Sequence, residues 1–439
     1  MQFPVEGGLI SGVPGEHPNT TVFKGVPYAA PPIGELRWKP PQPVIPWDGV
    51  RKCNKYSTIC PQPFQPDDGF YRKEFYDSPD PETSEDCLYL NIWAPTDHLQ
   101  DHNKTKAKLP VAIYIHGGSF DHGWGYEKEF DGEALTQHGV IFIAFNYRVN
   151  IFGFLTHPIL LENEATSKSG VAGVLDAICC VKWVYNNIEV FGGDKNNISL
   201  FGQSAGSILT TCLSMTTETK GIIKNIILQS GITHEVDSIN LLSQEESSNF
   251  GAKLLEPFNV KSIEDMYKIS TKELIERFIE FDKTQKGVFL CPSIDGNVLV
   301  SDISSAENNG SIHPMNIIIG FNSNDIYMDE FSKSAKSLSH VLTKQGKKIY
   351  VYYFNHDIPG DDKPGGFHSA ELWYMFGTYK KCWRPFDKND ADLSEKMVKY
   401  WSNFFRTGSP NSEGLFEWPC VTVDKYQRLE LSNEMKLIE

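Results

Sequence analysis

The sequence of 439 residues has no surplus of positive charge. Its 41 Lys and Arg residues stand against 56 Asp and Glu residues, and the formal net charge is −15 at pH 7. Proteins that bind nucleic acid or anionic membranes carry clusters of Lys and Arg, and no cluster of more than a few basic residues occurs here. We therefore expect neither partner, and an acidic, well-solvated surface accounts for the charge.

The sequence also lacks any apolar run long enough to cross a bilayer. Residues 1–8 have neither the basic region nor the apolar core of a signal peptide, which predicts a cytoplasmic protein, or a secreted one if a leader has been removed. Internal repeats, low-complexity tracts and linkers rich in Pro or Gly are missing as well. We expect residues 1–439 to form a single domain, since α/β folds often reach this length as one unit.

Cysteine is present in an odd number, nine, so at least one thiol in the monomer is unpaired. No spacing of Cys and His is typical of a zinc site. Cys179 and Cys180 are neighbours in a predicted helix, where we interpret them as small core residues. The sequence predicts no metal and no organic cofactor.

The motif around which the chain is organised is G-Q-S-A-G at 202–206. An apolar run at 197–202 predicts a buried strand, and the small residues from Ala205 onward open a helix. A serine on such a strand–turn–helix is held outward, and glycines two residues before and after it let the two backbones pack closely. We therefore predict that Ser204 is a nucleophile rather than part of an ordinary Gly-Ser loop.

An H-G-G element at 116–118 follows a second predicted strand at 109–115. Consecutive glycines leave their backbone N–H groups unobstructed, which suits the stabilisation of an oxyanion. Gly117 and Gly118, together with the N–H of Ala205, are the predicted oxyanion hole. A flexible turn is the alternative interpretation.

The base that activates a serine in this arrangement lies downstream, beyond the last strand of the sheet. The last strand that the apolar pattern predicts is 348–354, and only His356 and His368 follow it. His356 borders the end of the strand, whereas His368 lies in a Gly-containing loop that can reach across the top of the sheet. We predict His368 as the base.

The acid that orients the base lies between nucleophile and base in chain order. A predicted strand at 316–320 leads into a loop that contains Asp325, which we predict as this acid. Asp329 and Glu330 are competitors. They occur in a following predicted helix, where a solvent-exposed face is the expected position.

These residues and other motifs spread nearly end to end make the chain resemble the type B carboxylesterases. That α/β-hydrolase family includes acetylcholinesterase, bacterial p-nitrobenzyl esterases and the non-catalytic neuroligins. The matching motifs are F-K-G-V-P-Y-A at 23–29, L-R-W at 36–38, E-D-C-L-Y-L-N at 85–91, N-Y-R at 146–148, F-G-G-D at 191–194, G-Q-S-A-G at 202–206, Q-S-G at 229–231 and H-S-A-E at 368–371. The resemblance implies a central, mostly parallel twisted sheet flanked by helices, with a reduced cap because the chain is short for the family.

The resemblance also implies roles for residues. The family's nucleophile falls on Ser204, its base on His368 and its acid on Asp325, where most members carry Glu. Two further positions depart from the family: Gln203 stands where Glu is usual, and Ser119 stands where a third glycine is usual. The neutral amide of Gln203 removes a buried negative charge beside the imidazolium, which we expect to tune the reaction without changing its mechanism.

Other family positions imply architecture. Arg37 with Glu85, and Arg148 with Asp176, match structural ion pairs of relatives. Cys60 and Cys87 match positions that secreted relatives bridge, and such a bridge does not persist in a reducing cytoplasm.

Amphipathic helices predicted at 262–268 and 271–282 are the candidates for the cap, and the apolar stripe of a final helix at 393–406 predicts core packing. Phe120, Phe321 and Trp373 are candidate pocket aromatics, with core or wall positions as the alternative.

The function that these features predict is a serine carboxylic-ester hydrolase that cleaves small alkyl or aryl esters through an acyl-enzyme. A lipase, or a feruloyl or sugar-ester hydrolase, with the same triad is the first alternative. A non-catalytic interaction module like the neuroligins is the alternative of another class. The sequence does not predict the natural ester or the oligomeric state.

Overall fold

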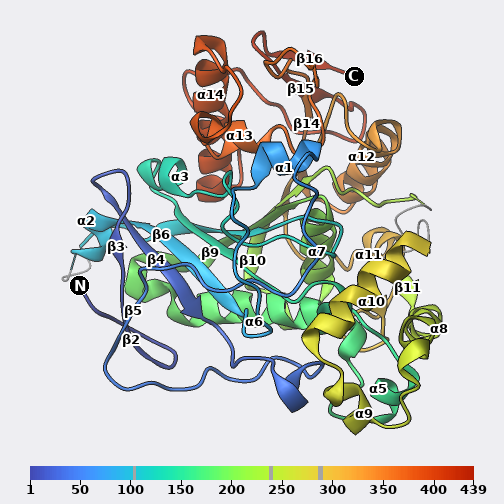
Figure 1. Ribbon diagram of the computed structural model, residues 1–439. Helices are drawn as coiled ribbons and strands as arrows, with labels where there is room; N and C mark the ends of the chain where they lie inside the picture. The colour runs from blue at the N-terminus through green and yellow to red at the C-terminus, as the bar shows by residue number, and fades with distance from the viewer. Residues whose placement is uncertain (102–104, 237–240, 285–289) are drawn as a thin grey trace.

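The computed structural model describes residues 1–101, 105–236, 241–284 and 290–439, and it is built on one large sheet. Its eleven strands lie in the order β16-β15-β14-β13-β10-β9-β7-β8-β6-β4-β3 (Figure 1). Their bounds are β3 Val13–Pro14, β4 Thr20–Pro27, β6 Tyr89–Pro95, β7 Leu109–Ile115, β8 Ile141–Phe145, β9 Gly193–Gln203, β10 Ile223–Gln229, β13 Asn316–Asn322, β14 Lys348–Phe354, β15 Arg428–Leu431 and β16 Lys436–Ile438. The strands from β15 to β8 pair in parallel, and antiparallel strands stand at both edges.

The central strands are apolar on both faces because helices cover both faces of the sheet. All residues of β7 and β8 are buried. In β7, Ile113 and Ile115 belong to the core on one face, whereas Ala112 and Tyr114 belong to the core on the other. Continuous apolar runs of this kind are typical of parallel strands between two helical layers, as the sequence predicted.

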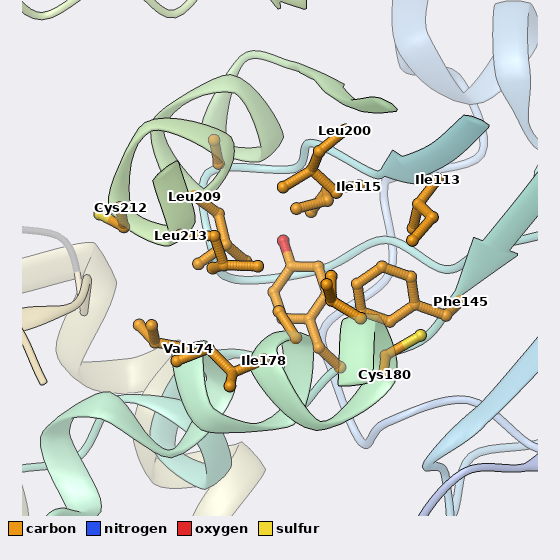
Figure 2. Close-up of a cluster of buried hydrophobic side chains, with 14 of the residues drawn as sticks. Ile113, Ile115, Phe145, Val174, Ile178, Cys180, Leu200, Leu209, Cys212 and Leu213 are labelled. Carbon is orange, nitrogen blue, oxygen red and sulfur yellow. The ribbon is translucent and has the colours of Figure 1, made fainter. Parts of the chain in front are cut away.

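The core of one face lies between the sheet and the helices α6 (Ala172–Asn187) and α7 (Ala205–Met215). Figure 2 shows side chains of β7, β8 and β9 pointing toward those of the two helices. The opposite face is covered by α3 (Glu133–Gln137), α13 (Leu372–Met375) and α14 (Lys388–Thr407). The three layers are therefore helix, sheet and helix.

A group of helices lies beside the sheet at one end of the molecule (Figure 1). It contains α5 (Pro158–Glu162), α8 (Gln244–Leu255), α9 (Ile263–Lys268) and α10 (Thr271–Thr284). Both helices that the sequence assigned to a cap are therefore confirmed as helices. The other α-helices are α1 (Phe70–Phe75), α2 (Thr96–Leu99), α4 (Asn150–Gly153), α11 (Ile303–Asn308) and α12 (Met328–Lys344).

Two boundaries differ from the sequence prediction. The strand at 348–354 is not the last one, because the short strands β15 and β16 extend the sheet beyond it. They have only four and three residues, R-L-E-L and K-L-I, so their apolar pattern is too short to identify. The last helix begins at Lys388 rather than 393, because the side chain of Asp387 accepts hydrogen bonds from two backbone N–H groups of its first turn.

The two ion pairs implied by the resemblance are present. Arg37 and Glu85 form a bidentate pair with contacts of 2.7 and 2.8 Å. Arg148 donates to both oxygens of Asp176 at 2.7 Å, and both side chains are almost completely buried. The pair joins the segment after β8 to α6, so it holds the helical layer against the sheet.

We expect Asp176→Ala to lower the free energy of unfolding by about 3–5 kcal/mol, because it leaves the buried guanidinium of Arg148 without its partner. Urea denaturation followed by circular dichroism measures the change. Glu395→Ala, which breaks the exposed pair with Lys399 on α14, is the control and should cost less than about 1 kcal/mol. Equal losses in the two variants would contradict the assigned importance of the buried pair.

Cys60 and Cys87 are both buried and unbridged. The neighbouring thiol of Cys60, together with burial, raises the pKa of Cys87. Among the described residues, no helix is long and apolar enough to cross a membrane. No group of three or more His, Cys, Asp and Glu side chains in that part of the chain is placed to hold a metal ion.

Candidate active site

Ser204 lies at the sharp turn between β9 and α7. Its backbone is at φ 56° and ψ −126°, a conformation that residues with a side chain rarely adopt. A Cβ on Gly202 would lie 2.4 Å from the backbone of Gly206, and one on Gly206 would lie 2.1 Å from the carbonyl oxygen of Ile115. Only glycine fits at either position, so the spacing of the motif follows from the closeness of strand and helix.

His368 and Asp325 come from two different loops at the carboxyl end of the sheet. Nδ1 of His368 lies 2.6 Å from Oδ1 of Asp325, and the Asp325 side chain is completely buried. The carboxylate also accepts the backbone N–H of Ile326 at Oδ1 and that of Asn322 at Oδ2. These bonds fix the carboxylate in the orientation in which it contacts the imidazole ring.

Backbone pairing between the two loops explains how the short side chain of Asp reaches the ring. The N–H of Asn324 donates to the carbonyl of Gly366 at 2.8 Å, and the side chain of Asn322 donates to the carbonyl of Phe367 at 2.7 Å. The loop that carries Asp325 is therefore attached to the segment just before His368. A longer Glu is not needed for the contact.

The competing residues lie elsewhere. Asp329 and Glu330 are exposed on the first turn of α12. His356 contacts Asp390 of α14 at 2.8 Å, and the same carboxylate oxygen accepts the hydroxyl of Tyr374 at 2.6 Å. His356 therefore belongs to a buried cluster that joins the end of β14 to α13 and α14.

The segment after β7 carries the predicted oxyanion donors. Within the described residues, no hydrogen-bond acceptor takes the N–H of Gly117 or of Gly118. Ser119 and Phe120 follow with φ of 54° and 63°, so the turn keeps its left-handed course although Ser119 replaces a glycine. The N–H of Asn150 donates to the carbonyl of Phe120 at 2.6 Å and supports this turn from α4.

The ring nitrogen of His368 that faces away from Asp325 contacts Gln203. Nε2 of the side chain of Gln203 lies 3.0 Å from Nε2 of His368. In the described part of the chain, no hydrogen bond joins the Ser204 hydroxyl to His368. Catalytic hydrogen bonds are often long before substrate binds, so the geometry remains compatible with proton transfer from Ser204.

Glu371 is a buried carboxyl group to which the sequence assigned no role, although the H-S-A-E motif at 368–371 places it three residues after His368. It accepts hydrogen bonds from Asn322 at 2.5 Å and from Gln229 at 3.2 Å. Burial raises its pKa to about 7, and the nearby Asp325 adds to the shift while Asn322 opposes it. The network joins β10 and β13 to the loop that carries His368.

The raised pKa of Glu371 makes stability depend on pH. The ordinary pKa of 4.5 applies to the unfolded chain, so between pH 4.5 and 7 the folded protein holds a proton that the unfolded protein lacks. This contribution, about 3 kcal/mol, is complete below pH 4.5 and is lost as the pH rises through 7. We expect Glu371→Gln to remove it, so that urea denaturation shows a shallower fall in stability from pH 5 to 8. Parallel falls in both proteins would contradict the assignment.

The predicted pocket aromatics are buried. Phe120 packs edge-on against Phe154, and Phe321 and Trp373 are completely enclosed. The alternative interpretation as core or wall residues therefore holds for all three. An exposed aromatic residue near the loop that carries His368 is Phe70 of α1, whose ring packs edge-on against that of Phe367, the residue before His368, with ring centroids 4.9 Å apart. It comes from a distant part of the sequence, and no motif singled it out.

A helix–sheet–helix sandwich with a serine on a strained strand–helix turn and a His–Asp pair above the parallel strands defines the α/β-hydrolase class. The sequence pattern of the carboxylesterase family matches residues 2–340 and 329–439 of the chain. The chain belongs to this family, and it is a carboxylic ester hydrolase.

Individual relatives agree with this placement. The chain is 34% identical to the fumonisin B1 esterase of Sphingopyxis macrogoltabida, over 94% of this chain and 83% of that protein. It is 27% identical to the para-nitrobenzyl esterase of Bacillus subtilis, over 94% and 92% of the two chains. Its structure superposes on the Geobacillus stearothermophilus carboxylesterase EST55 with a TM-score of 0.83 at 26% identity, over 100% and 97% of the two chains.

Proposed function

We propose that the chain hydrolyses small alkyl or aryl carboxylic esters, with Ser204 as the nucleophile, His368 as the base and Asp325 as the acid that orients the base. The observation that carries this proposal is the 2.6 Å contact between Nδ1 of His368 and Oδ1 of Asp325, formed at the same end of the sheet as a serine with positive φ. A nucleophile, a base and a group that orients the base are the three parts that serine catalysis requires.

The reaction has two halves. In the first, His368 accepts the hydroxyl proton of Ser204 while the oxygen attacks the ester carbonyl, and the alcohol takes this proton as it leaves. The N–H groups of Gly117, Gly118 and Ala205 stabilise the negative charge that develops on the carbonyl oxygen. In the second half, water gives a proton to the same base and attacks the acyl-enzyme, which releases the acid and restores the serine.

Two alternatives differ in what they require. A lipase, or a feruloyl or sugar-ester hydrolase, uses the same three residues and differs in the length or shape of the acyl group that it accepts. A non-catalytic interaction module of the neuroligin kind does not need a nucleophile, a base and an acid in contact. The presence of Ser204, His368 and Asp325 together supports the hydrolase.

A panel of esters tests the proposal. The purified protein is assayed with p-nitrophenyl acetate, butyrate, octanoate and palmitate, with p-nitrobenzyl acetate, and with fumonisin B1, since relatives are named for the last two kinds of substrate. We expect the highest kcat/KM for the acetate or butyrate. A maximum at palmitate would favour a lipase. Turnover of fumonisin B1 alone would show that the chain cleaves a narrow class of esters rather than small esters in general.

A covalent probe tests the nucleophile directly. Diethyl p-nitrophenyl phosphate transfers its phosphoryl group to an activated serine and releases p-nitrophenol. We expect one equivalent of label on the peptide that contains Ser204, found by mass spectrometry. Label on another serine, or no label together with no ester turnover, would overturn the proposal in favour of the interaction module.

We also propose a reducing compartment such as the cytoplasm. All nine cysteines are free, and Cys60 and Cys87 are adjacent without being bridged. Thiols this close persist where glutathione and thioredoxin keep them reduced. Nine titratable thiols in protein isolated from its source and denatured without reductant would agree with this location, and seven would point to a bridge.

A further inference from the structure

Gln203 contacts the ring nitrogen that the proposed mechanism needs. Its side-chain nitrogen lies 3.0 Å from Nε2 of His368, and its side chain is buried. The other end of the amide packs against the oxyanion segment, since a Cβ on Gly117 would lie 3.0 Å from Oε1 of Gln203. The amide of Gln203 therefore bridges the oxyanion segment and the base.

The position of the proton on the imidazole ring decides the nature of this contact. Nδ1 faces the carboxylate of Asp325 at 2.6 Å, and a carboxylate accepts hydrogen bonds, so Nδ1 carries the proton. Nε2 of the neutral ring then has a lone pair and accepts. The group that faces Nε2 must donate, which is consistent with the amide nitrogen of Gln203 lying toward the ring.

A donor at Nε2 stabilises the neutral imidazole and disfavours the imidazolium. A carboxylate at the same place, the side chain usual in the family, only accepts and would stabilise the imidazolium instead. The two side chains therefore have opposite effects on a base that must be neutral to take a proton from Ser204.

We propose that Gln203 is a positioning residue that keeps His368 neutral by donating to Nε2, and that it releases this nitrogen to the Ser204 hydroxyl when substrate binds. The inference rests on the proposed role of His368 as the base. After proton transfer, a half-turn of the amide brings Oε1 to the protonated Nε2, so the same side chain accepts from the imidazolium. The consequence is an ester hydrolase that keeps its activity at lower pH than one with Glu at this position.

Other titratable groups lie around the base and the oxyanion segment, and they are common to all variants. They are Asp325 after β13, Glu371 before α13, Tyr71 in α1, Tyr352 in β14, and His116 and His122 after β7. Burial raises the pKa of Tyr71 to about 12 and that of Tyr352 above its usual range, and it lowers the pKa of His116 to about 3 and of His122 to about 4. These four residues keep one charge state between pH 5 and 9, and Asp325 and Glu371 contribute equally to every variant.

The test compares the pH dependence of kcat/KM for p-nitrophenyl acetate in the wild type, Gln203→Met and Gln203→Glu. Methionine keeps the volume and removes the donor, whereas Glu adds a charge within about 3 Å of Nε2. We expect the acid limb of the profile to move to higher pH in the order wild type, Met, Glu, with a displacement of about 1–2 pH units for Glu. On the acid side of both limbs this corresponds to a loss of about 10- to 100-fold for Gln203→Glu, with much smaller losses at pH 9.

A matched control exists elsewhere in the chain. Gln345 lies between α12 and the amino end of β14, at the end of the sheet opposite to the site, and its side chain donates to the carbonyl of Glu307 at 2.7 Å, so Gln345→Glu makes the same exchange away from His368. We expect its acid limb to coincide with that of the wild type. A uniform loss of activity at every pH in the Gln203 variants, with an unmoved limb, would show a merely structural role and overturn the inference.

A spectroscopic measurement separates this inference from the proposed function. Selective ¹⁵N labelling of histidine, with His368 assigned from His368→Ala, follows protonation of its Nε2 without any substrate. The titration midpoint should be higher in Gln203→Glu than in the wild type, whether or not the chosen esters are cleaved. Coincident titrations with normal ester turnover would overturn the role of Gln203 and leave the hydrolase intact.

Discussion

Replacement of Ser204 by Ala is expected to lower the turnover of p-nitrophenyl acetate by roughly 10⁴- to 10⁶-fold. The change removes the oxygen that forms the acyl-enzyme, and the N–H groups of the oxyanion segment alone give only the residual rate of a serine hydrolase without its triad. The loss is expected in kcat, with little change in KM, because the serine forms its covalent bond only during the reaction. Steady-state kinetics with enzyme purified from an esterase-deficient host measures both values.

A second serine in the same turn provides the control. Ser207 is buried in the first turn of α7 and donates to the carbonyl of Gly231 at 3.2 Å. We expect Ser207→Ala to cost about 1 kcal/mol of stability and to retain most of the activity. Thermal denaturation must show that Ser204→Ala is folded. Wild-type rates in a folded Ser204→Ala protein would exclude Ser204 as the nucleophile.

Asp325→Asn is expected to lower kcat by about 10⁴-fold, because an amide changes the hydrogen bond that selects the tautomer of His368. The carboxylate accepts from Nδ1–H and leaves a lone pair on Nε2 for the serine proton. An Asn side chain that donates to Nδ1 instead places the ring proton on Nε2, where it blocks proton transfer. The replacement keeps the shape of the side chain, and thermal denaturation must show that the variant is folded.

Asp329→Asn is the matched control, because Asp329 is the competing carboxylate in the sequence and is exposed on α12. We expect it to keep the wild-type rate. If Asp329→Asn lost activity and Asp325→Asn did not, the acid would have to be reassigned. Asp325→Glu adds a further test: the two loops already bring the short side chain to 2.6 Å, so the longer one is expected to push the ring aside and to reduce the rate.

Features that depend on a few neighbouring residues could be predicted from the sequence. The turn at 202–206 needs glycines on both sides of Ser204 because backbones pass within contact distance there, and this requirement is visible as a local pattern. The buried parallel strands β7 and β8 are visible as continuous apolar runs. The family and its helix–sheet–helix architecture follow from motifs of this local kind, and the family match and the related structures confirm them.

Contacts that depend on how two loops meet could not be predicted from the sequence. The sequence favoured Asp325 over Asp329 because of its place in a loop after a strand, but the contact with His368 depends on the pairing of the segment 322–324 with the segment 366–367. The buried ion pair of Arg384 with Glu74 joins segments that lie more than 300 positions apart in the sequence. No local sequence pattern predicts it.

The sequence by itself thus determined the class of protein, the fold and the candidate nucleophile and base, because each follows from patterns of residues that are neighbours along the chain. The tertiary structure alone decided how Asp325 comes into contact with His368, that Gln203 contacts the second ring nitrogen, and that burial raises the pKa of Glu371 to about 7. The physical reason is that hydrogen bonds and desolvation depend on distances of a few ångströms between groups that the chain brings together only when it folds.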